Sequence, residues 1–284
     1  MKHRIITMAV ALCAICVGHA SAQMKAPTTS PRYAPIPSPS GFNGTGIPFV
    51  SLDFDGDDFV LGPVIPRQDH FSVCMWIKLD AGGDAIQYLY GEDGPSSFTG
   101  TSIYTNTGGE VFWNIMRDSD TTKIATQIYT GGTFPRDEWV FIGMSGGDGE
   151  KVTGVLYATG SKTWVSATSA TDVTGGKTVS IQGARLGPQS LAIFAGNIAH
   201  VRIYDTTLSV ADFQVIAFSA VHGGVGQIAN WPMLPADATA DSQTLHDASG
   251  NDNDATRGAN TSPSANDPQY GTTYKSITAG GPQP

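Results

Sequence analysis

The feature that most constrains this chain is the grouping of its apolar residues between Phe49 and Asp205. They come in runs of four to eight residues bounded by Gly, Asp, Asn and Pro, and no window keeps a helical period for more than two turns. Such runs are typical of short β-strands. The predicted strands are Phe49–Phe54, Phe59–Leu61, Phe71–Leu79, Ile86–Tyr90, Thr101–Thr105, Glu110–Arg117, Lys123–Tyr129, Trp139–Ser145, Thr153–Ala158, Thr163–Ser166, Thr178–Gln182 and Ala192–Tyr204.

This many short strands with glycine-rich turns predict an all-β fold, an antiparallel β-sandwich of the jelly-roll type. In the segment 71–78 the odd-numbered residues point to one face and the even-numbered residues to the other, and both sets are partly apolar. We therefore expect this strand in the middle of a sheet, covered on one side by the second sheet and on the other by loops or edge packing.

One short helix near the C-terminal end of the core interrupts the strands. Ser209 can cap a helix from Val210 to Phe218, and Asp212 is placed to complete a capping box. The residues expected to face the sheet are Phe213, Ile216 and Ala217.

Residues 1–22 have the pattern of a secretory signal, with early basic residues, an apolar run and a small-residue ending at Ala20 to Ala22. The run is too short to span a bilayer, and no later segment approaches the required length. We therefore expect a secreted, periplasmic or cell-surface protein without a membrane span. Cys13 and Cys16 leave with the signal, so Cys74 has no intramolecular disulfide partner and is expected to be a buried small hydrophobe.

The two ends of the mature chain differ in composition from its middle. Residues 23–48 are rich in Pro, Ser and Thr and predict an extended linker, while residues 259–284 predict a loosely ordered tail. The sandwich is assigned to residues 49–258. A net charge of −9 argues against a nucleic-acid-binding surface, which needs clustered Lys and Arg.

Four segments, in order, resemble the laminin G-like or concanavalin A-like jelly-roll superfamily. They are SLDFDGDDFVLG (51–62), FSVCMWIKLD (71–80), DEWVFIGMS with GVLYATG (137–160) and GNIAHVRIYDTTLSVADFQVI (196–216). The resemblance implies that Trp76 and Trp139 belong to the core. A fifth segment, 229–259, is similar to an element that commonly precedes the opening strand. Here it follows the helix, so it either completes the same sandwich in permuted order or begins a second module. The short remainder of the chain favours the first arrangement.

Enzymes of this resemblance carry recognisable side-chain arrays. A glycosidase needs two carboxylates flanking the scissile bond, and the Glu-x-Asp-x-Glu strand of lichenase-type relatives is absent, as is the Arg, Gln, His and Tyr constellation of polysaccharide lyases. We expect a non-catalytic module that recognises a glycan or an extracellular or cell-surface protein. The alternative is a structural building block of an extracellular or virion-type assembly that binds no sugar. The oligomeric state is not fixed by the sequence.

Calcium is the ion that the sequence favours, because oxygen ligands abound. Two segments compete for it, with solvated turns as the alternative: DFDGDDF crowds three carboxylates, and HDASGNDND alternates oxygen-bearing side chains but lacks the bidentate Glu of an EF-hand. The family's acidic pair before Arg-Ile-Tyr is replaced here by Ala199 and His200, which argues against a family-type site. The candidate ligands are Asp55, Asp57, Asp58, Asp247 and Asn251.

Sugar binding on such sandwiches usually rests on exposed aromatic rings that stack on a pyranose, with Asp and Asn binding its hydroxyls. The candidates outside the family's core positions are Tyr104, Trp113, Tyr129 and Trp164, which lie near polar, glycine-containing segments. For each of them, packing in the core or at its rim is the alternative role.

Overall fold

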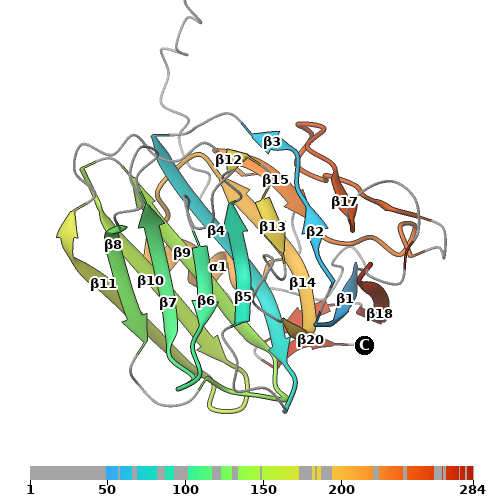
Figure 1. Cartoon of the computed structure of the whole chain (residues 1–284), viewed down its shortest axis with the longest axis horizontal. Coiled ribbons are helices and arrows are strands. Elements are labelled where there is room, and N and C mark those ends of the chain that lie inside the picture. Colours follow the sequence, from blue (N-terminus) through green and yellow to red (C-terminus); the bar gives the residue numbers. More distant parts are fainter. Residues whose placement is uncertain are drawn as a thin grey trace, which may run out of the picture. The chain divides into compact units, whose positions relative to one another are not determined.

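Two eight-stranded antiparallel sheets build the sandwich in the described part of this computed structural model (Figure 1). The structure describes residues 49–56, 58–65, 69–81, 87–92, 102–116, 123–129, 134–147, 149–172, 181–182, 184–186, 194–219, 224–238, 242–258, 264, 267–274, 276–278 and 280–283. The expected signal and linker, residues 1–48, lie outside these ranges.

The first sheet has the strand order β11-β10-β9-β4-β14-β1-β18, and β15 also pairs with β14. Its strands are β1 (Phe49–Asp55), β4 (His70–Leu79), β9 (Val140–Gly147), β10 (Lys151–Ala158), β11 (Thr163–Asp172), β14 (Ala195–Tyr204), β15 (Gln227–Trp231) and β18 (Gln269–Tyr274).

The second sheet has the order β16-β17-β2-β13-β5-β6-β7-β8. Its strands are β2 (Val60–Leu61), β5 (Gln87–Glu92), β6 (Ser102–Thr105), β7 (Val111–Met116), β8 (Lys123–Tyr129), β13 (Ala184–Leu186), β16 (Thr244–Leu245) and β17 (Ala255–Arg257). The described residues also form two short strand pairs: β3 (Val64–Ile65) with β12 (Ile181–Gln182), and β19 (Ser276–Thr278) with β20 (Gly281–Gln283).

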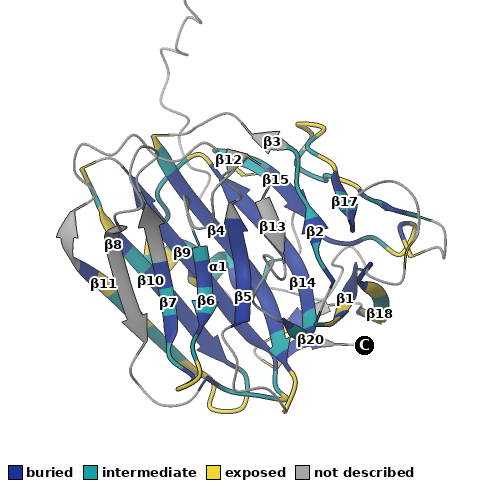
Figure 2. Ribbon diagram, in the orientation of Figure 1, coloured by how far each residue is buried: buried dark blue, intermediate teal, exposed yellow. Residues whose placement is uncertain are grey.

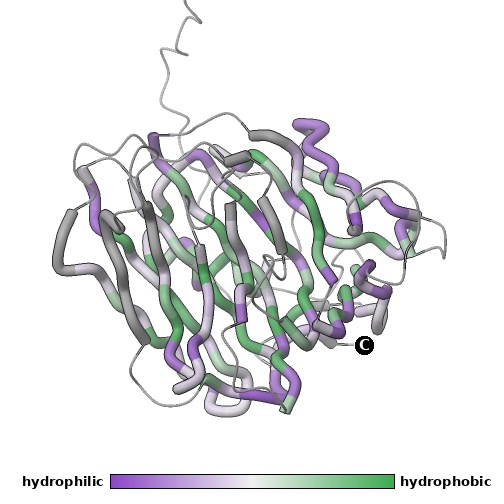
Figure 3. The backbone as a smooth tube through the Cα atoms, in the orientation of Figure 1, coloured by the Kyte–Doolittle hydropathy of each residue, from purple (hydrophilic) through white to green (hydrophobic). Residues whose placement is uncertain are grey.

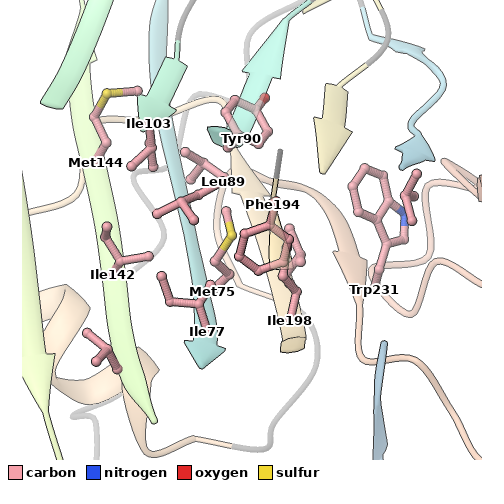
Figure 4. Packing of buried hydrophobic residues seen from close by; sticks show 14 of the residues in the cluster. Met75, Ile77, Leu89, Tyr90, Ile103, Ile142, Met144, Phe194, Ile198 and Trp231 are labelled. Carbon is pink, nitrogen blue, oxygen red and sulfur yellow. The ribbon is translucent and has the colours of Figure 1, made fainter. Parts of the chain in front are cut away.

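The main core fills the space between the sheets (Figure 2). Alternation along β4 sends Met75 and Ile77 inward, where they join Leu89 and Ile103 of the second sheet (Figure 4). Apolar residues follow the strands and polar residues gather in the connecting segments, as Figure 3 shows. The predicted all-β sandwich is confirmed, and each predicted strand overlaps a strand of the structure.

The opposite face of the first sheet is covered by helix α1 (Val210–Ala217), whose Phe213 and Ala217 are buried against it with Ile216 packed beside them, as expected, and by Ile277 of β19. Trp76 on that face donates its indole N–H to the carbonyl of Ala217 at 3.0 Å. The helix sits close because Gly143 has no side chain, and a Cβ there would lie 2.7 Å from the ring of Phe213. Burial of Trp76 and Trp139 confirms their expected core positions.

Both ends of α1 are held by side chains. Ser209 and Asp212 form the predicted capping box. At the other end, buried Arg202 donates to the carbonyl oxygens of Ile216 at 2.7 Å and of Ser219. With eight residues, α1 is far too short to cross a bilayer, and no longer apolar helix occurs among the described residues.

The segment 229–258 completes the same sandwich, which is the first of the two arrangements considered above. Within β15, Trp231 pairs with Val201 of β14, and β17 pairs with β2 in the second sheet. The expectation of a loosely ordered tail after residue 258 is wrong for its described part, because β18 pairs with β1 and extends the first sheet. Strand β18 has few apolar residues, so the sequence pattern did not predict it. It forms because β1 offers an edge with which it can pair.

Candidate functional site

A row of three aromatic side chains crosses the outer face of the second sheet. The register pairs Tyr88 of β5 with Tyr104 of β6, and Tyr104 with Phe112 of β7. The ring centroids lie 5.0 Å and 4.9 Å apart, and the Tyr104 and Phe112 rings are parallel to within 4°. None of the three belongs to either buried hydrophobic cluster of the described residues. We call these three residues the aromatic row.

The row offers ring edges and phenol groups rather than a flat platform. Tyr104 and Phe112 are partly exposed and Tyr88 is buried. Because β6 lies between β5 and β7, the two faces of the Tyr104 ring are flanked by Tyr88 and Phe112. Side chains on a sheet stand roughly perpendicular to it, so the partly exposed Tyr104 ring projects away from the sheet. Tyr104 was expected to stack on a sugar, and the structure assigns its ring faces to its neighbours.

The phenol of Tyr88 is kept in its neutral form. Burial, and secondly the neighbouring Tyr104, raise the pKa of Tyr88 to about 12. A phenol with this pKa stays protonated at physiological pH, and it can then both donate and accept a hydrogen bond.

A polar pair lies next to the aromatic row on the same face. Asn106 follows Tyr104 by two residues and Glu110 precedes Phe112 by two, so alternation puts both beside the row. The Asn106 Nδ2 donates to Glu110 Oε2 at 2.7 Å, and both residues are partly exposed. Tyr88, Phe112 and this pair are not among the site residues predicted from the sequence.

Trp113 follows Phe112 on β7, so its side chain lies on the opposite face of the second sheet. It is 1% exposed and belongs to the core between the sheets. A Cβ on Gly154 of β10 would lie 2.4 Å from its ring, so the indole packs against the backbone of the first sheet. This packing corrects the ligand-facing role expected for Trp113, because a buried ring has no face to offer a sugar.

The four predicted stacking residues are therefore not brought together. Trp164 lies on β11 in the first sheet, where it is partly exposed and its ring centroid is 5.0 Å from that of Tyr157 and 6.2 Å from that of Phe218. Tyr129 is paired with Val111 at the end of β8, and its side chain lies outside the described part of the structure.

The second predicted calcium segment is an internally bonded turn. The Asp247 carboxylate accepts hydrogen bonds from the backbone N–H groups of Asn230, Ser249 and Asn253, at 2.8, 2.8 and 3.0 Å. Asn251 turns its amide nitrogen toward the carbonyl of Gln227 at 2.8 Å. These hydrogen bonds fasten the turn to β15, and calcium binding by Asp247 and Asn251 stays a prediction.

The first predicted calcium segment also closes on itself. Asp58 is buried, and its Oδ2 accepts the backbone N–H of Asp55 at 2.9 Å. Asp57 lies outside the described residues. In the described part of the chain, no three His, Cys, Asp or Glu residues are grouped as a metal site.

Ala199 and His200 stand where the family has an acidic pair, and His200 has a structural role there. His200 is buried at a bulge of β14 with a φ of 55°, and its Nε2 accepts the Nε–H of Arg202 at 3.2 Å. His200 thus supports the arginine that holds the end of α1.

Comparison with known proteins agrees with this architecture. The model of a family described as the concanavalin A-like lectin/glucanases superfamily matches residues 55–214. The chain belongs to this superfamily. The match runs from the end of β1 into α1, so the superfamily pattern includes the aromatic row but not the strands from β15 onward.

Several solved structures are similar to this chain at low sequence identity. A candidate carbohydrate-binding protein from Bacteroides ovatus ATCC 8483 is 12% identical, with a TM-score of 0.51, covering 78% of this chain and 62% of that one. A heptameric SAP-like pentraxin from Limulus polyphemus is 14% identical, with a TM-score of 0.41, covering 60% and 81%. A Trypanosoma rangeli sialidase in complex with sialic acid is 13% identical, with a TM-score of 0.40, covering 61% and 27%. No curated protein matches the sequence.

Proposed function

We propose that this protein is an exported binding module that holds a carbohydrate on the outer face of β5, β6 and β7 and does not cleave it. The observation that carries the proposal is the aromatic row (Tyr88, Tyr104 and Phe112), which lies on the sheet face turned away from the core. Membership of a lectin and glucanase superfamily supports it.

The chemistry of the row suits a sugar. A pyranose combines apolar C–H patches with hydroxyls that both donate and accept hydrogen bonds. The ring edges of Tyr104 and Phe112 give apolar contact, and the phenol of the partly exposed Tyr104 carries a polar end. An amphipathic aromatic side chain meets both needs at low cost in conformational entropy.

The non-catalytic part of the proposal rests on the acids. Cleavage needs a pair of carboxyl groups on either side of the glycosidic bond. Glu110 is the acid beside the row, and its Oε2 is bound by Asn106. The lichenase array is absent from the sequence, and among the described residues of β5, β6 and β7 the acid is Glu92, at the end of β5.

The proposal includes export of the protein and glycan partners outside the cell. Residues 1–22 have the pattern of a secretory signal. An exported module of this kind meets glycans on a cell surface or in an extracellular matrix, and we propose these as its partners.

The test is carbohydrate binding by single variants. Wild type and the variants Tyr104→Ala, Phe112→Ala and Trp164→Ala are compared by affinity electrophoresis and calorimetry on xylan, galactomannan, laminarin and hydroxyethylcellulose. We expect at least tenfold weaker binding for the first two variants and little change for Trp164→Ala. Thermal melting checks that each variant is folded.

Two results would contradict the proposal. Loss of binding in Trp164→Ala alone would move the site to the first sheet. Absence of binding to every glycan, together with concentration-dependent assembly, would favour a structural building block.

A further inference from the structure

The polar pair Asn106 and Glu110 lies at one side of the aromatic row. The backbone N–H of Asn106 donates to the carbonyl of Glu110 at 3.0 Å, which continues the β6–β7 pairing by one step beyond Thr105 and Val111. A ligand on the row therefore has this pair as its immediate polar neighbour.

The turn holds the pair in one arrangement. Asn106 Oδ1 accepts the backbone N–H groups of Gly108 and Glu110, both at 2.9 Å, so its amide orientation is set by the backbone. The remaining donor, Nδ2, is directed at Glu110 Oε2 at 2.7 Å. Gly109 takes a φ of 75°, which an L-residue rarely adopts, and this keeps the turn tight.

One carboxylate oxygen is left for a ligand. Glu110 Oε1 receives no hydrogen bond from the described residues, while Oε2 is fixed by Asn106, and the side chain is partly exposed. A carboxylate held in this way is a pre-organised acceptor. It loses little conformational entropy when it binds a hydroxyl donor.

The charges on this part of the sheet have one sign. Among the described residues of β5, β6, β7 and the β6–β7 turn, the charged ones are Glu92 and Glu110, and the nearest basic residues along the sheet are Lys123 on β8 and Arg185 on β13. An anionic sugar bound against Glu110 would be repelled by its carboxylate, whereas a neutral sugar would meet a hydroxyl acceptor.

We propose that Glu110, held in place by Asn106, is the specificity residue of the glycan site: it accepts a hydroxyl of a neutral sugar and disfavours sugars that bear carboxylate or sulfate groups. The inference rests on the proposed function, because it names the substrate class and a selecting residue for the same surface.

The test compares matched neutral and anionic polymers. Wild type, Glu110→Gln and the control Asp252→Asn are measured on hydroxyethylcellulose and carboxymethylcellulose, and on galactan and polygalacturonate. Asp252→Asn removes the same charge from an exposed residue with a φ of 57°, a conformation that Asn tolerates. Glu110→Gln keeps an oxygen for the Asn106 amide, so the turn is retained.

We expect wild type to bind the neutral member of each pair at least tenfold more tightly. Glu110→Gln should weaken neutral binding at least tenfold and reduce the preference over the anionic polymer, while Asp252→Asn should change neither by more than twofold. A second variant, Asn106→Asp, places a carboxylate against Glu110 and should lower neutral binding as well. Thermal melting confirms folding.

The failures of the two proposals are distinguishable. If Tyr104→Ala abolishes binding but Glu110→Gln and Asn106→Asp behave as wild type, the glycan site stands and the role of Glu110 is overturned. If wild type prefers the anionic polymers, the charge argument is overturned. If neither the row nor the pair affects binding, or no polymer binds, the proposed function fails first.

Discussion

Both sheets carry aromatic side chains on their outer faces, but only one of these faces has a helix packed on it in the described structure. On the first sheet, Trp76 and its aromatic neighbours lie beneath α1, and Phe213 fills the space above Gly143. On the second sheet, the aromatic row stays outside both buried clusters, with Tyr104 and Phe112 partly exposed.

The difference shows that an outward-facing aromatic residue is not by itself evidence of a binding surface. The same strand periodicity produces both faces. The outer face of the first sheet is covered because a capped helix follows β14 and Gly143 leaves room for that helix. The other keeps partly exposed rings beside a polar pair. The following changes test that contrast, from the largest expected effect to the smallest.

Removing the covering ring should cause the largest loss of stability. Phe213 is fully buried, and Phe213→Ala should lower the free energy of unfolding by about 3–5 kcal/mol, through lost burial and a cavity over Gly143. Urea denaturation followed by fluorescence measures this loss. A loss of unfolding free energy below about 1 kcal/mol would show that packing of α1 on the sheet contributes little to stability.

The thiol beneath the helix should resist labelling. Burial, opposed by the nearby Arg202, raises the pKa of Cys74 to about 12 from 9.0, so its thiolate fraction at pH 8 falls about a thousandfold. We expect very slow reaction with a thiol reagent, and fast reaction for a cysteine introduced by Tyr104→Cys on the other face. Equal labelling rates at positions 74 and 104 would show that the two sheet faces do not differ in exposure.

The same thiol gives a pH dependence of stability. Its folded pKa is raised, so the contribution of the neutral thiol is fully present below pH 9 and is lost as the pH rises from 9 toward about 12. A Cys74→Ala variant should show a shallower loss of stability over that range in urea denaturation.

Removing a ring from the aromatic row should cost less than removing Phe213. Phe112 is partly exposed and stacks on Tyr104 at 4.9 Å, so Phe112→Ala should lower stability by about 1–1.5 kcal/mol while it weakens carbohydrate binding. A loss as large as that of Phe213→Ala would mean that the row is a second covered core rather than a surface.

The helix cap should have the smallest effect. The hydroxyl of Ser209 accepts the N–H of Asp212 at 3.2 Å, and Ser209→Ala should lower stability by about 1 kcal/mol. Ser209→Asp, which keeps an acceptor at the same place, should restore most of it. No difference between Ala and Asp in denaturation would show that the cap is unimportant.

Much of the fold could be predicted from the residues, but the candidate site could not. The alternation of residues 71–78 and the capping box at Ser209 were both readable in the sequence. Phe112 and Trp113 are adjacent aromatic residues on one strand, and a shift of one residue exchanges the face on which each lies. The pairing of Tyr104 with Phe112 across the NTGG turn was the signal that could have placed them.

The sequence by itself determined the strands, the turns and the capped helix, because these depend on side-chain period and backbone preference over a few neighbouring residues. Tertiary structure alone decided which rings are covered, which strand edges β15 and β18 join, and that Asp247 binds the backbone N–H of Asn230. Those outcomes depend on groups far apart in the chain, whose meeting no local pattern records.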